Sequence, residues 1–559
     1  MSPAAPLPAR LRRSRHLSWF AHAGAVYLFH DLYGYLMEMS PDIAGMIEAF
    51  DDGVATEDTV AHYRGKLGDG DPREFVEILV GHAVLVEPSE DEIEGLWAFV
   101  PIKGKWNVWQ RREDRLTVWT AWGERPVQQL FLDPEETKIW DAFDGHKRLI
   151  ELRHHHDNAK LIGLVKRLVH SDVQALKLSV MPWSAYAKRP GMAPAYLAST
   201  MPYARWLVGT PVPGTPTSDT VAPTEYYRHE VADADAQFDH QETTLSHLLR
   251  VPHPALGGLT YGQRLADAVV TRGLVPPVTV RVLEIGAGLG YVAHDLIARL
   301  RATGRAVEYT IVELSPALAA AQQARLGDAA RWIAGDVLEA LLPEGSFDLI
   351  LSNEMAGDLP ARAITRADLG LEPDQGTADR DKVRALSPLV ADSGVNLDDA
   401  PAATYLMTGA FEMVARIARW LAPGGASVVT EFGDLAGWPR LSTHLDHPEL
   451  STHFGQLQQV ARSLGLTADI EFVIDVLEVD RDEKGLATTR SHFRALRALA
   501  ADVGVDLAKV GYTPALLGKA VEGKLDLATI GELRWDRIED RLMGLVPHEF
   551  KALILRRAR

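Results

Sequence analysis

One stretch, Val280–Leu300, constrains the fold more than any other part of the chain. A run of apolar residues is broken by Gly286, Gly288 and Gly290, and apolar residues then return at the spacing of a helix. This pattern predicts a buried parallel strand, a tight turn and a helix. In a doubly wound sheet, such glycines let a ligand approach the backbone at the carboxyl end of the strand.

A carboxylate follows on the next predicted strand. The run Tyr309–Glu313 ends in an acid 23 positions after Gly290, where it can accept hydrogen bonds from a ribose diol. Glu284 stands two residues before the first glycine, so the motif reads E-x-G-x-G-x-G. The G-x-G-x-x-G of dinucleotide-binding folds has a different spacing.

Two later signals follow along the chain. Gly335 is followed by Asp336 and Val337, and the strand Phe347–Ser352 ends in Asn353 and Glu354. Together, and in this order, the motifs resemble those of the class I S-adenosylmethionine (SAM) methyltransferases, and a fortuitous glycine turn is the alternative. The resemblance implies that Asp336 and Val337 lie beside the adenine. The resemblance implies SAM as cofactor, with eight residues binding it: Glu284, Gly286, Gly288, Gly290, Glu313, Asp336, Val337 and Asn353.

Length and composition place the chain among ordinary soluble proteins with several domains. A chain of 559 residues is too long for one core, and 47% hydrophobic with 24% charged residues is typical of globular proteins. No uninterrupted apolar run is long enough to span a membrane, so we expect no membrane partner and a cytoplasmic location. The absence of cysteine excludes disulfides, thiolate metal sites and cysteine nucleophiles, and no metal is expected.

Charge argues against a nucleic-acid partner. The net charge of −18 disfavours an extended surface for nucleic acid and tolerates a cationic partner. Residues 1–16 are basic and rich in proline, and we expect them to be disordered. A short mitochondrial transit peptide is the alternative reading of this segment.

Residues 17–180 contain an internal repeat. The segments 39–51 and 132–144 align at an offset of 93, which matches Pro41 with Pro134. Each proline follows a residue that caps helices well, so both segments are predicted helices. In each copy we expect two strands before this helix, and two further helices and a short strand after it.

The repeated cadence L-[ND]-x-x-[AG]-x-x-I-x-x-x-[FL]-D-G resembles the PqqD-like domains, which bind leader peptides of ribosomally made natural products. It implies two winged-helix units, at 17–90 and 91–181, that capture an extended peptide on a sheet edge. DNA-binding winged helices are one alternative, disfavoured because Asp71, Glu74 and Glu77 make one predicted recognition helix acidic. A purely structural dimerisation module, and hence a homodimer, is the other.

Two features beside the repeats have simple interpretations. Adjacent histidines on a helix point in different directions, so His154–His156 are predicted to be a solvated helix end rather than metal ligands. Residues 182–223 are rich in proline and are expected to be a partly extended linker.

From residue 224 to 559 the pattern alternates strand and helix. It predicts an α/β class: a Rossmann-like doubly wound sheet of the class I methyltransferases, preceded by the two small α+β winged-helix domains. The segment 224–249 comes before the first strand and is expected to cover the SAM pocket, with Tyr226, Tyr227 and His229 as candidates or as plain surface residues.

Four further segments carry a closer resemblance: Tyr309–Leu318, Ser352–Pro360, Glu431–Asp434 and Met543–Leu553. They resemble the MidA-like family, which includes the mitochondrial complex I assembly methyltransferase. The resemblance covers residues 275–360, 420–475 and the last twenty. Characterised members methylate arginine side chains of a protein, which implies a polypeptide acceptor and a nitrogen nucleophile. Two insertions, at 361–402 and 480–535, are expected to reshape the acceptor pocket, and the second is predicted to be helical.

The chain departs from that family at acceptor-side positions. Asp358 falls one residue late, with Gly357 where the family has its aspartate. His453 and Glu431 each stand in place of another aspartate. These departures put arginine as the acceptor in question.

The sequence therefore predicts a SAM-dependent N-methyltransferase that acts on a peptide or protein held by the front half. Glu354 and Asn353 are the first catalytic candidates, with Asp358 and His453 as further ones. Glu354 could orient a cationic nitrogen or could cap a helix. The rivals are a protein arginine methyltransferase or assembly factor of the MidA type, and a small-molecule methyltransferase whose front half dimerises.

Overall fold

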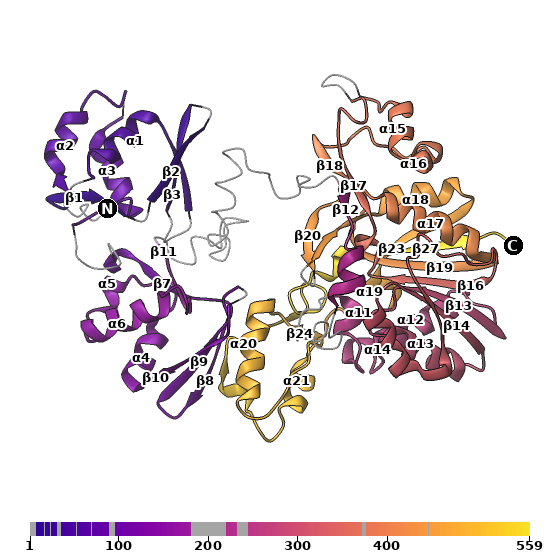
Figure 1. Ribbon diagram of the computed structural model, residues 1–559. Coiled ribbons are helices and arrows are strands. Elements are labelled where there is room, and N and C mark those ends of the chain that lie inside the picture. Colours follow the sequence, from indigo (N-terminus) through magenta and orange to yellow (C-terminus); the bar gives the residue numbers. More distant parts are fainter. Residues whose placement is uncertain are drawn as a thin grey trace. The chain divides into compact units, whose positions relative to one another are not determined.

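The computed structural model describes residues 7–15, 17–22, 24–30, 35–51, 53–68, 70–88, 96–123, 125–179, 220–231, 244–371, 376–444 and 447–559. The chain divides into two compact units (Figure 1). The first comprises Met1–Val212, Ser491–Val505 and Gly523–Glu532, and the second Pro213–Arg490, Asp506–Glu522 and Leu533–Arg559. Residues 182–219 of the expected linker lie outside the described residues.

The first unit contains the predicted repeat. Each copy has an antiparallel three-stranded sheet followed by three helices. The first copy consists of β2 (Leu17–His22), β3 (Ala25–His30), β4 (Tyr35–Met39), α1 (Pro41–Glu48), α2 (Thr56–Tyr63) and α3 (Pro72–Gly81). The second consists of β8 (Asn107–Arg112), β9 (Arg115–Thr120), β10 (Gln128–Leu132), α4 (Pro134–Ala142), α5 (Leu149–Leu152) and α6 (Asn158–Val169).

The helix starts follow the predicted capping. The Ser40 hydroxyl accepts a hydrogen bond from the third residue of α1, and Asp133 forms a reciprocal capping box with Glu136 in α4. Each copy has an apolar core, with Phe50 fully buried in the first and Trp140 in the second, and Ala83 and Val86 of the first copy also belong to the second core. The prediction of a solvated end at His154–His156 is confirmed, because the first two of these histidines are exposed in the turn after α5.

The strands differ from the prediction. Each copy has a third strand in its sheet, β4 or β10, where two were expected. A further strand precedes each copy: β1 (Arg10–Arg13) pairs with β5 (Val54–Ala55) and β6 (Leu85–Val86), and β7 (Val100–Lys103) pairs with β11 (Leu176–Ser179). The expectation of disorder for residues 1–16 is therefore wrong at β1, whose Leu11 is fully buried.

The carboxy-terminal insertion expected at 480–535 is shared between the two units. Its described elements are β24 (Lys484–Leu486), α20 (Arg490–Ala501), α21 (Pro514–Ala520), β25 (Ile530–Gly531) and β26 (Trp535–Arg537). Residues 491–505 and 523–532 belong to the first unit, where β25 pairs with β8 and extends the second sheet to β10-β9-β8-β25. The insertion is thus partly strand, not wholly helical.

The second unit is built on one large sheet, in the order β15-β14-β13-β16-β19-β27-β23. Its strands are β13 (Thr279–Ile285), β14 (Ala306–Glu313), β15 (Arg331–Ala334), β16 (Phe347–Asn353), β19 (Leu421–Asp434), β23 (Leu466–Phe472) and β27 (Phe550–Arg557). Only β27 on this path runs antiparallel to its neighbours. The chain reverses its lateral direction between β13 and β16, which is where doubly wound sheets bind ligands.

Helices cover both faces of this sheet. The pair α12 (Tyr261–Thr271) and α13 (Tyr291–Ala302) lies on one face, with α14 (Pro316–Leu326) nearby, and α17 (Thr408–Trp420) and α18 (Phe454–Ser463) lie on the other (Figure 1). The buried apolar runs of the central strands therefore face helices on both sides, as parallel sheets require.

The insertion at 361–402 is a folded part of this unit. It contains β17 (Ala361–Thr365), α15 (Arg380–Leu386) and α16 (Pro388–Ser393), and it leads into β18 (Ala403–Leu406). With β12 (Thr220–Val221), β17 and β18 form a small sheet. Val383 and Val390 are buried in the main core, so this segment is packed although its sequence is polar.

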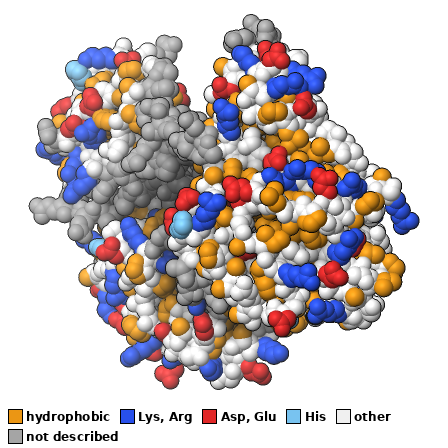
Figure 2. All heavy atoms as spheres, turned by 45° about the vertical axis from the view of Figure 1, so that its right-hand side comes forward, with side chains coloured by type: hydrophobic (Ala, Val, Ile, Leu, Met, Phe, Trp, Pro, Cys, Tyr) orange, Lys and Arg blue, Asp and Glu red, His pale blue; other side chains and the backbone are white. Residues whose placement is uncertain are grey.

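Shorter elements complete the second unit: a π-helical turn at Tyr226–Glu230, α11 (Leu245–Leu248), β20 (Leu441–His444), β21 (His447–Leu450), β22 (Thr452–His453) and α19 (Val473–Val476). Within the described residues, no helix has both the length and the apolar character needed to cross a membrane. Figure 2 shows Lys and Arg side chains interspersed with Asp and Glu on the visible face.

Candidate active site

The glycine turn lies at the carboxyl end of β13. Gly286, Gly288 and Gly290 have φ angles of 67°, 51° and 76°, in the left-handed region that favours glycine. A Cβ on Gly286 would lie 2.9 Å from Cγ of Met355, whereas a Cβ on Gly288 would meet no atom within 4 Å. Gly288 therefore leaves space beside the backbone for a ligand, and Gly290 caps α13.

Glu313 ends β14, and both of its carboxylate oxygens are held. Oε1 accepts the backbone N–H of Ser315 at 2.9 Å, and Oε2 accepts from Nε2 of Gln322 at 2.7 Å. Gln322 also donates to the carbonyl oxygen of Gly288 at 2.8 Å. Burial raises the pKa of Glu313, and its hydrogen bonds act in the opposite direction. The predicted ribose acid is thus fixed beside the glycine turn.

Glu284 lies at the end of β13 and is only 1% exposed. Its Oε2 accepts a 2.8 Å hydrogen bond from the hydroxyl of Tyr309. Burial raises the pKa of Glu284 to about 7, the Tyr309 hydrogen bond acts against this rise, and the nearby Glu313 adds to it. Asp336 follows β15, where it accepts the N–H of Leu338 at 2.8 Å.

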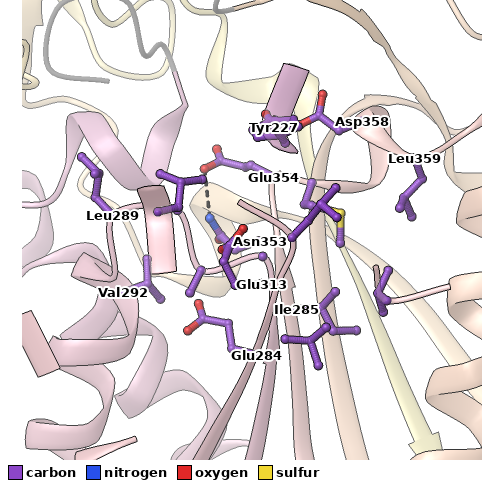
Figure 3. Close-up of a pocket in the computed structure, with 18 of the residues that line it drawn as sticks. Tyr227, Glu284, Ile285, Leu289, Val292, Glu313, Asn353, Glu354, Asp358 and Leu359 are labelled. Atoms are coloured by element: carbon purple, nitrogen blue, oxygen red, sulfur yellow. Dashed lines mark hydrogen bonds between the residues drawn. The ribbon is translucent and has the colours of Figure 1, made fainter. Parts of the chain in front are cut away.

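One pocket gathers these residues (Figure 3). Seven of the eight predicted cofactor residues line it: Glu284, Gly286, Gly288, Glu313, Asp336, Val337 and Asn353. Gly290 is not among the lining residues and serves as the helix cap. A glycine backbone with open space and a buried acid at the next strand end match the amino-acid and ribose parts of SAM, so the residues present fit this cofactor.

Asn353 ends β16 and is oriented by its neighbours. Its Oδ1 accepts from the hydroxyls of Tyr261 at 2.8 Å and Thr430 at 2.9 Å. Its Nδ2 donates to Oγ of Ser246 at 2.9 Å and to Oε2 of Glu354 at 3.0 Å. These contacts fix the amide in the pocket wall.

Glu354 has a left-handed backbone, with φ of 54°. Its Oε1 accepts the N–H of Leu245 at 2.7 Å, and its Oε2 accepts the N–H of Ser246 at 3.3 Å and the hydroxyl of the same residue. Glu354 therefore caps α11, which precedes it in the chain, instead of the next helix. The carboxylate that we expected to orient the acceptor lines the pocket but is held by this helix.

Asp358 lines the pocket one residue after a tightly packed glycine. The N–H of Gly357 donates to Oε2 of Glu431 at 3.0 Å, and a Cβ at Gly357 would lie 2.5 Å from the carbonyl oxygen of Leu450. A side chain therefore has no room at 357. At this position, where the MidA-like motif has its aspartate, only glycine fits, and the next residue, Asp358, lines the pocket.

The segment 224–249 contributes to the pocket as predicted, since Thr224, Tyr227, Thr244, Ser246 and His247 line it. The three candidates named from the sequence differ in position. The Tyr227 hydroxyl donates to Asp358 at 2.7 Å, while Tyr226 is buried beside Tyr227. His229 is exposed and faces Glu225 at 3.5 Å, away from the lining residues.

His453 is not among the residues that line the pocket. Its Nδ1 accepts the N–H of Gln456 at 3.4 Å, so it is the N-cap of α18, and its ring packs edge-on against Trp438. Burial lowers the pKa of His453. The expectation that His453 faces the acceptor is not met, because the capping position directs its ring to the helix.

Several residues whose side chains contact the site were not predicted. Gln322, Ser246, Tyr261 and His447 belong to none of the patterns used in the sequence analysis. Tyr261 and Thr430 reach Asn353 from other elements of the unit, and the hydroxyl of Tyr261 is fully buried. In the MidA-like family a glutamine follows the motif that resembles Tyr309–Leu318, and this is the one signal that could have identified Gln322.

Comparison with known proteins agrees with the class of protein that the sequence motifs predict. Residues 268–434 match the model of a family described as "Putative S-adenosyl-L-methionine-dependent methyltransferase". None of the curated proteins compared with the chain matches it. The protein is a SAM-dependent methyltransferase with SAM as its cofactor. Within that class, the match supports the resemblance of the second unit to the MidA-like family.

Solved structures show weaker similarity. A protein of Burkholderia thailandensis bound to S-adenosyl-homocysteine is 18% identical, with a TM-score of 0.33 over 57% of this chain and 79% of that one. Another protein of that organism is 18% identical, with a TM-score of 0.32 over 60% and 91%. Phosphoethanolamine N-methyltransferase 2 of Haemonchus contortus is 16% identical, with a TM-score of 0.29 over 61% and 67%. These likenesses are too weak to carry an argument about substrate.

The sequence motifs predict how each part of the cofactor would be held in this pocket. When bound, SAM supplies a methyl group activated by sulfonium charge. The backbone at Gly286 and Gly288 would hold the methionine portion, Glu313 the ribose hydroxyls, and Asp336 with Val337 the adenine. The protein's remaining work is to align the acceptor, exclude water and keep its nucleophilic atom deprotonated.

Proposed function

We propose that the protein is a cytoplasmic SAM-dependent N-methyltransferase whose acceptor is a peptide or protein captured by the first unit. A ribosomally synthesised natural-product precursor is the acceptor class that fits the PqqD-like resemblance best. The first unit would hold a leader segment while the acceptor residue reaches the pocket. Such tethering raises the local concentration of the acceptor and lets the pocket itself be weakly selective.

The observation that best supports peptide capture is the sheet of the second copy. Its two edges differ. The outer edge of β8 pairs with the chain's own β25, whereas among the described residues no strand pairs with the outer edge of β10. Phe131 on β10 is 69% exposed, which is unusual for a large apolar side chain on a strand.

An unpaired edge strand can accept an extended peptide as an additional strand. Main-chain hydrogen bonds then supply affinity, and exposed side chains such as Phe131 supply selectivity. The β25 contact is a precedent within the chain itself, since Ile530 and Gly531 pair antiparallel with Gln110 and Trp109. The same sheet thus already holds one added strand, and β10 is the edge that we assign to the substrate.

The test uses the full-length protein, labelled SAM and an extract from the source cells, followed by separation of polypeptides from small molecules. We expect the label in the polypeptide fraction. The variant Phe131→Asp should lower labelling by about ten-fold at limiting acceptor, because a buried apolar anchor contributes on the order of 1.5–3 kcal/mol. Its SAM affinity, measured by calorimetry, should equal that of the unaltered protein.

Leu341→Asp is the matched control, because Leu341 is 96% exposed in the second unit and should tolerate the charge without loss of labelling. Label confined to small molecules would support the small-molecule rival and contradict the proposal. Equal labelling by Phe131→Asp and Leu341→Asp would show that β10 does not hold the substrate.

A further inference from the structure

The loop that joins β9 to β10 in the first unit lies beside a half-buried cation. Nζ of Lys177, on β11, lies 4.4 Å from the ring centroid of Trp122 in this loop and 5.8 Å from that of Trp106. The centroids of the two indole rings are 4.3 Å apart, so the ammonium faces a pair of aromatic rings. A cation is attracted to such faces, and Lys177 is therefore held beside the loop.

A second cation reaches the same loop from α20. The guanidinium of Arg494 donates to the carbonyl oxygens of Gly123 and Arg125, to the second at 2.6 Å. Residues 491–505 belong to the first unit, so this contact lies within one unit. Arg125 is itself exposed and adds a third positive side chain. We call Arg125, Lys177 and Arg494 the basic cluster.

Within the part of the chain that the structure describes, no carboxylate contacts the basic cluster. Nζ of Lys177 donates to Oε1 of Gln174 at 2.7 Å, which is a neutral acceptor, and an ammonium has three N–H donors in all. Burial lowers the pKa of Lys177 to about 8, and the charge of Arg125 acts in the same direction. An anion beside this ammonium would oppose both effects.

One acid of the first unit contacts β10, but at a distance from the loop. Oδ2 of Asp502 accepts from Nε2 of Gln129 at 2.6 Å. Asp502 stands eight positions after Arg494, which corresponds to about 12 Å along a helix. This separation exceeds the screening length of about 8 Å at physiological ionic strength. Asp502 therefore offsets the charge at the loop only weakly.

The basic cluster lies at the start of the edge strand that we assign to the substrate. The loop covers residues 121–127, and β10 begins at Gln128, whose partner on β9 is Thr120. A peptide that pairs antiparallel with β10 passes Phe131 first and Gln128 last, and its next residues run beside the loop. Antiparallel addition continues the pattern of this sheet, because β9 with β10 and β8 with β25 are antiparallel pairs.

We propose that the basic cluster holds the acidic end of an extended peptide that pairs antiparallel with β10, so that Asp or Glu residues follow the paired segment. The inference rests on the proposed capture of a peptide by β10, and it adds the chemistry and the direction of that peptide. Carboxylates form charge-assisted hydrogen bonds with ammonium and guanidinium groups. Charge also sets the direction, because a peptide bound the other way round would carry its acids away from the cluster.

The charge of the whole chain favours a peptide over a nucleic acid at this place. The net charge of −18 disfavours a long polyanion, whose binding needs many cations along its backbone. Two or three side-chain carboxylates need only a local group of cations, and the basic cluster is such a group. The same edge also offers Phe131, which is exposed and apolar and suits a peptide side chain.

The first test measures the binding of designed peptides to the full-length protein by fluorescence anisotropy. Three labelled peptides share a segment of alternating threonine and valine: one ends in Glu-Glu, one begins with Glu-Glu, and one ends in Gln-Gln. We expect the first to bind about ten-fold more tightly than the other two. The difference should shrink to about two-fold or less in about 1 M salt, because salt screens the charges. Equal affinity of the three peptides, or a preference for the one that begins with Glu-Glu, would overturn the proposal.

Substitutions in the cluster give the second test. Lys177→Gln should weaken binding of the peptide that ends in Glu-Glu by about ten-fold, and the exposed Arg125→Gln by about three-fold. Neither should change the affinity of the Gln-Gln peptide. Arg115→Gln is the matched control, because it removes the same charge from the exposed start of β9, at the other end of the sheet. Equal affinities in all three variants would contradict the proposal. If Lys177→Gln fails to fold, Arg125→Gln decides.

The third test follows the Lys177 side chain itself. Acetic anhydride acetylates only neutral amines, and a bound carboxylate both covers the ammonium and stabilises its charge. The peptide that ends in Glu-Glu should therefore slow acetylation of Lys177 by about five-fold or more, as measured by mass spectrometry of the digested protein. Lys138, which is exposed and paired with Glu135, should react at the same rate with and without the peptide. Unchanged acetylation of Lys177 would show that the peptide binds elsewhere.

The last comparison separates this inference from the proposed function. Phe131→Asp should weaken the peptides that end in Glu-Glu and in Gln-Gln by the same factor. If it does so while the unaltered protein shows no preference for acids, capture on β10 stands and the inference fails. If the preference for acids is present and label from the extract appears only on small molecules, the inference stands. The acidic peptide is then a partner and not the methyl acceptor, and the proposed function fails.

Discussion

The side-chain amide of Gln322 donates a 2.7 Å hydrogen bond to Glu313, the acid at the end of β14. The same amide donates to the carbonyl oxygen of Gly288, and its oxygen accepts from the indole of Trp332 at 3.1 Å. Gln322 is fully buried, so its amide holds Glu313 and the glycine turn at a fixed separation. One residue of α14 thus joins two parts of the pocket that come from different strands.

Gln322→Ala should therefore weaken SAM binding. Without the amide, one oxygen of the buried Glu313 loses a donor and the carbonyl of Gly288 loses its partner. A hydrogen bond to a charged group is worth about 1.5–3 kcal/mol, which corresponds to a loss of about 10- to 100-fold in affinity. Calorimetric titration with SAM measures this directly.

Gln323→Ala is the matched control, because Gln323 is the exposed neighbour on the same helix. It should bind SAM with unchanged affinity. If Gln322→Ala also binds SAM normally while remaining folded, Gln322 does not organise the pocket.

Glu284 gives the protein a pH-dependent stability. Burial raises its pKa from 4.5 to about 7, against the opposing hydrogen bond from Tyr309. Between those values the folded protein keeps a proton that the unfolded chain releases, so the free energy of unfolding falls as pH rises through this window. The slope approaches about 1.4 kcal/mol per pH unit where the two states differ by one proton.

Glu284→Gln should remove this dependence. The melting temperature of the variant, relative to that of the unaltered protein, should rise between about pH 5 and about pH 8. Glu308→Gln, exposed on the neighbouring strand β14, should follow the unaltered protein at every pH. If the melting temperatures of Glu284→Gln and Glu308→Gln depend on pH in the same way, the pKa of Glu284 is the same in the folded and the unfolded protein.

Local patterns predicted the elements of the second unit well. The strands β13, β14 and β16 have buried apolar runs, and the acids and glycines that end them stand at fixed positions in the sequence. A parallel sheet brings strand ends to one edge, so the pocket could be assembled from sequence alone. Seven of the eight residues predicted to bind the cofactor line the pocket for this reason.

Contacts between distant segments could not be predicted. Tyr227 and His447 are 220 positions apart, and Glu354 meets Ser246 across 108. Neither pair belongs to a motif, because such contacts depend on how loops and short helices pack and not on local periodicity. The strand β1 was missed for the same reason, since its partners β5 and β6 lie far along the chain.

Gly357→Ala tests the packing that positions Asp358. The new Cβ would lie 2.5 Å from the carbonyl oxygen of Leu450, so the turn must move away from β21. We expect a loss of about 1–3 kcal/mol in stability, the usual cost of overpacking. Thermal unfolding measures the loss. Gly376→Ala, which meets no atom within 4 Å, should melt like the unaltered protein, and equal melting of both variants would contradict the packing argument.

Gly531→Ala tests whether β25 is an integral strand of the first unit. Its Cβ would lie 2.0 Å from the indole of Trp109, so β25 could not keep its register on β8. Backbone amides of β8 should then exchange faster with deuterium, while SAM affinity is unchanged because the pocket lies in the second unit.

Gly163→Ala in α6 is the control, since no atom lies within 4 Å of its Cβ and exchange in β8 should stay as in the unaltered protein. Unchanged exchange in Gly531→Ala would mean that β25 contributes nothing to this sheet.

If β25 is integral, a deletion of residues 1–180 removes most of the first unit and leaves residues 491–505 and 523–532 without the partners that they pack against in that unit. Loss of activity after such a deletion would then report damage to the fold as much as loss of peptide capture, and point substitutions on β10 in the full-length chain are the decisive test.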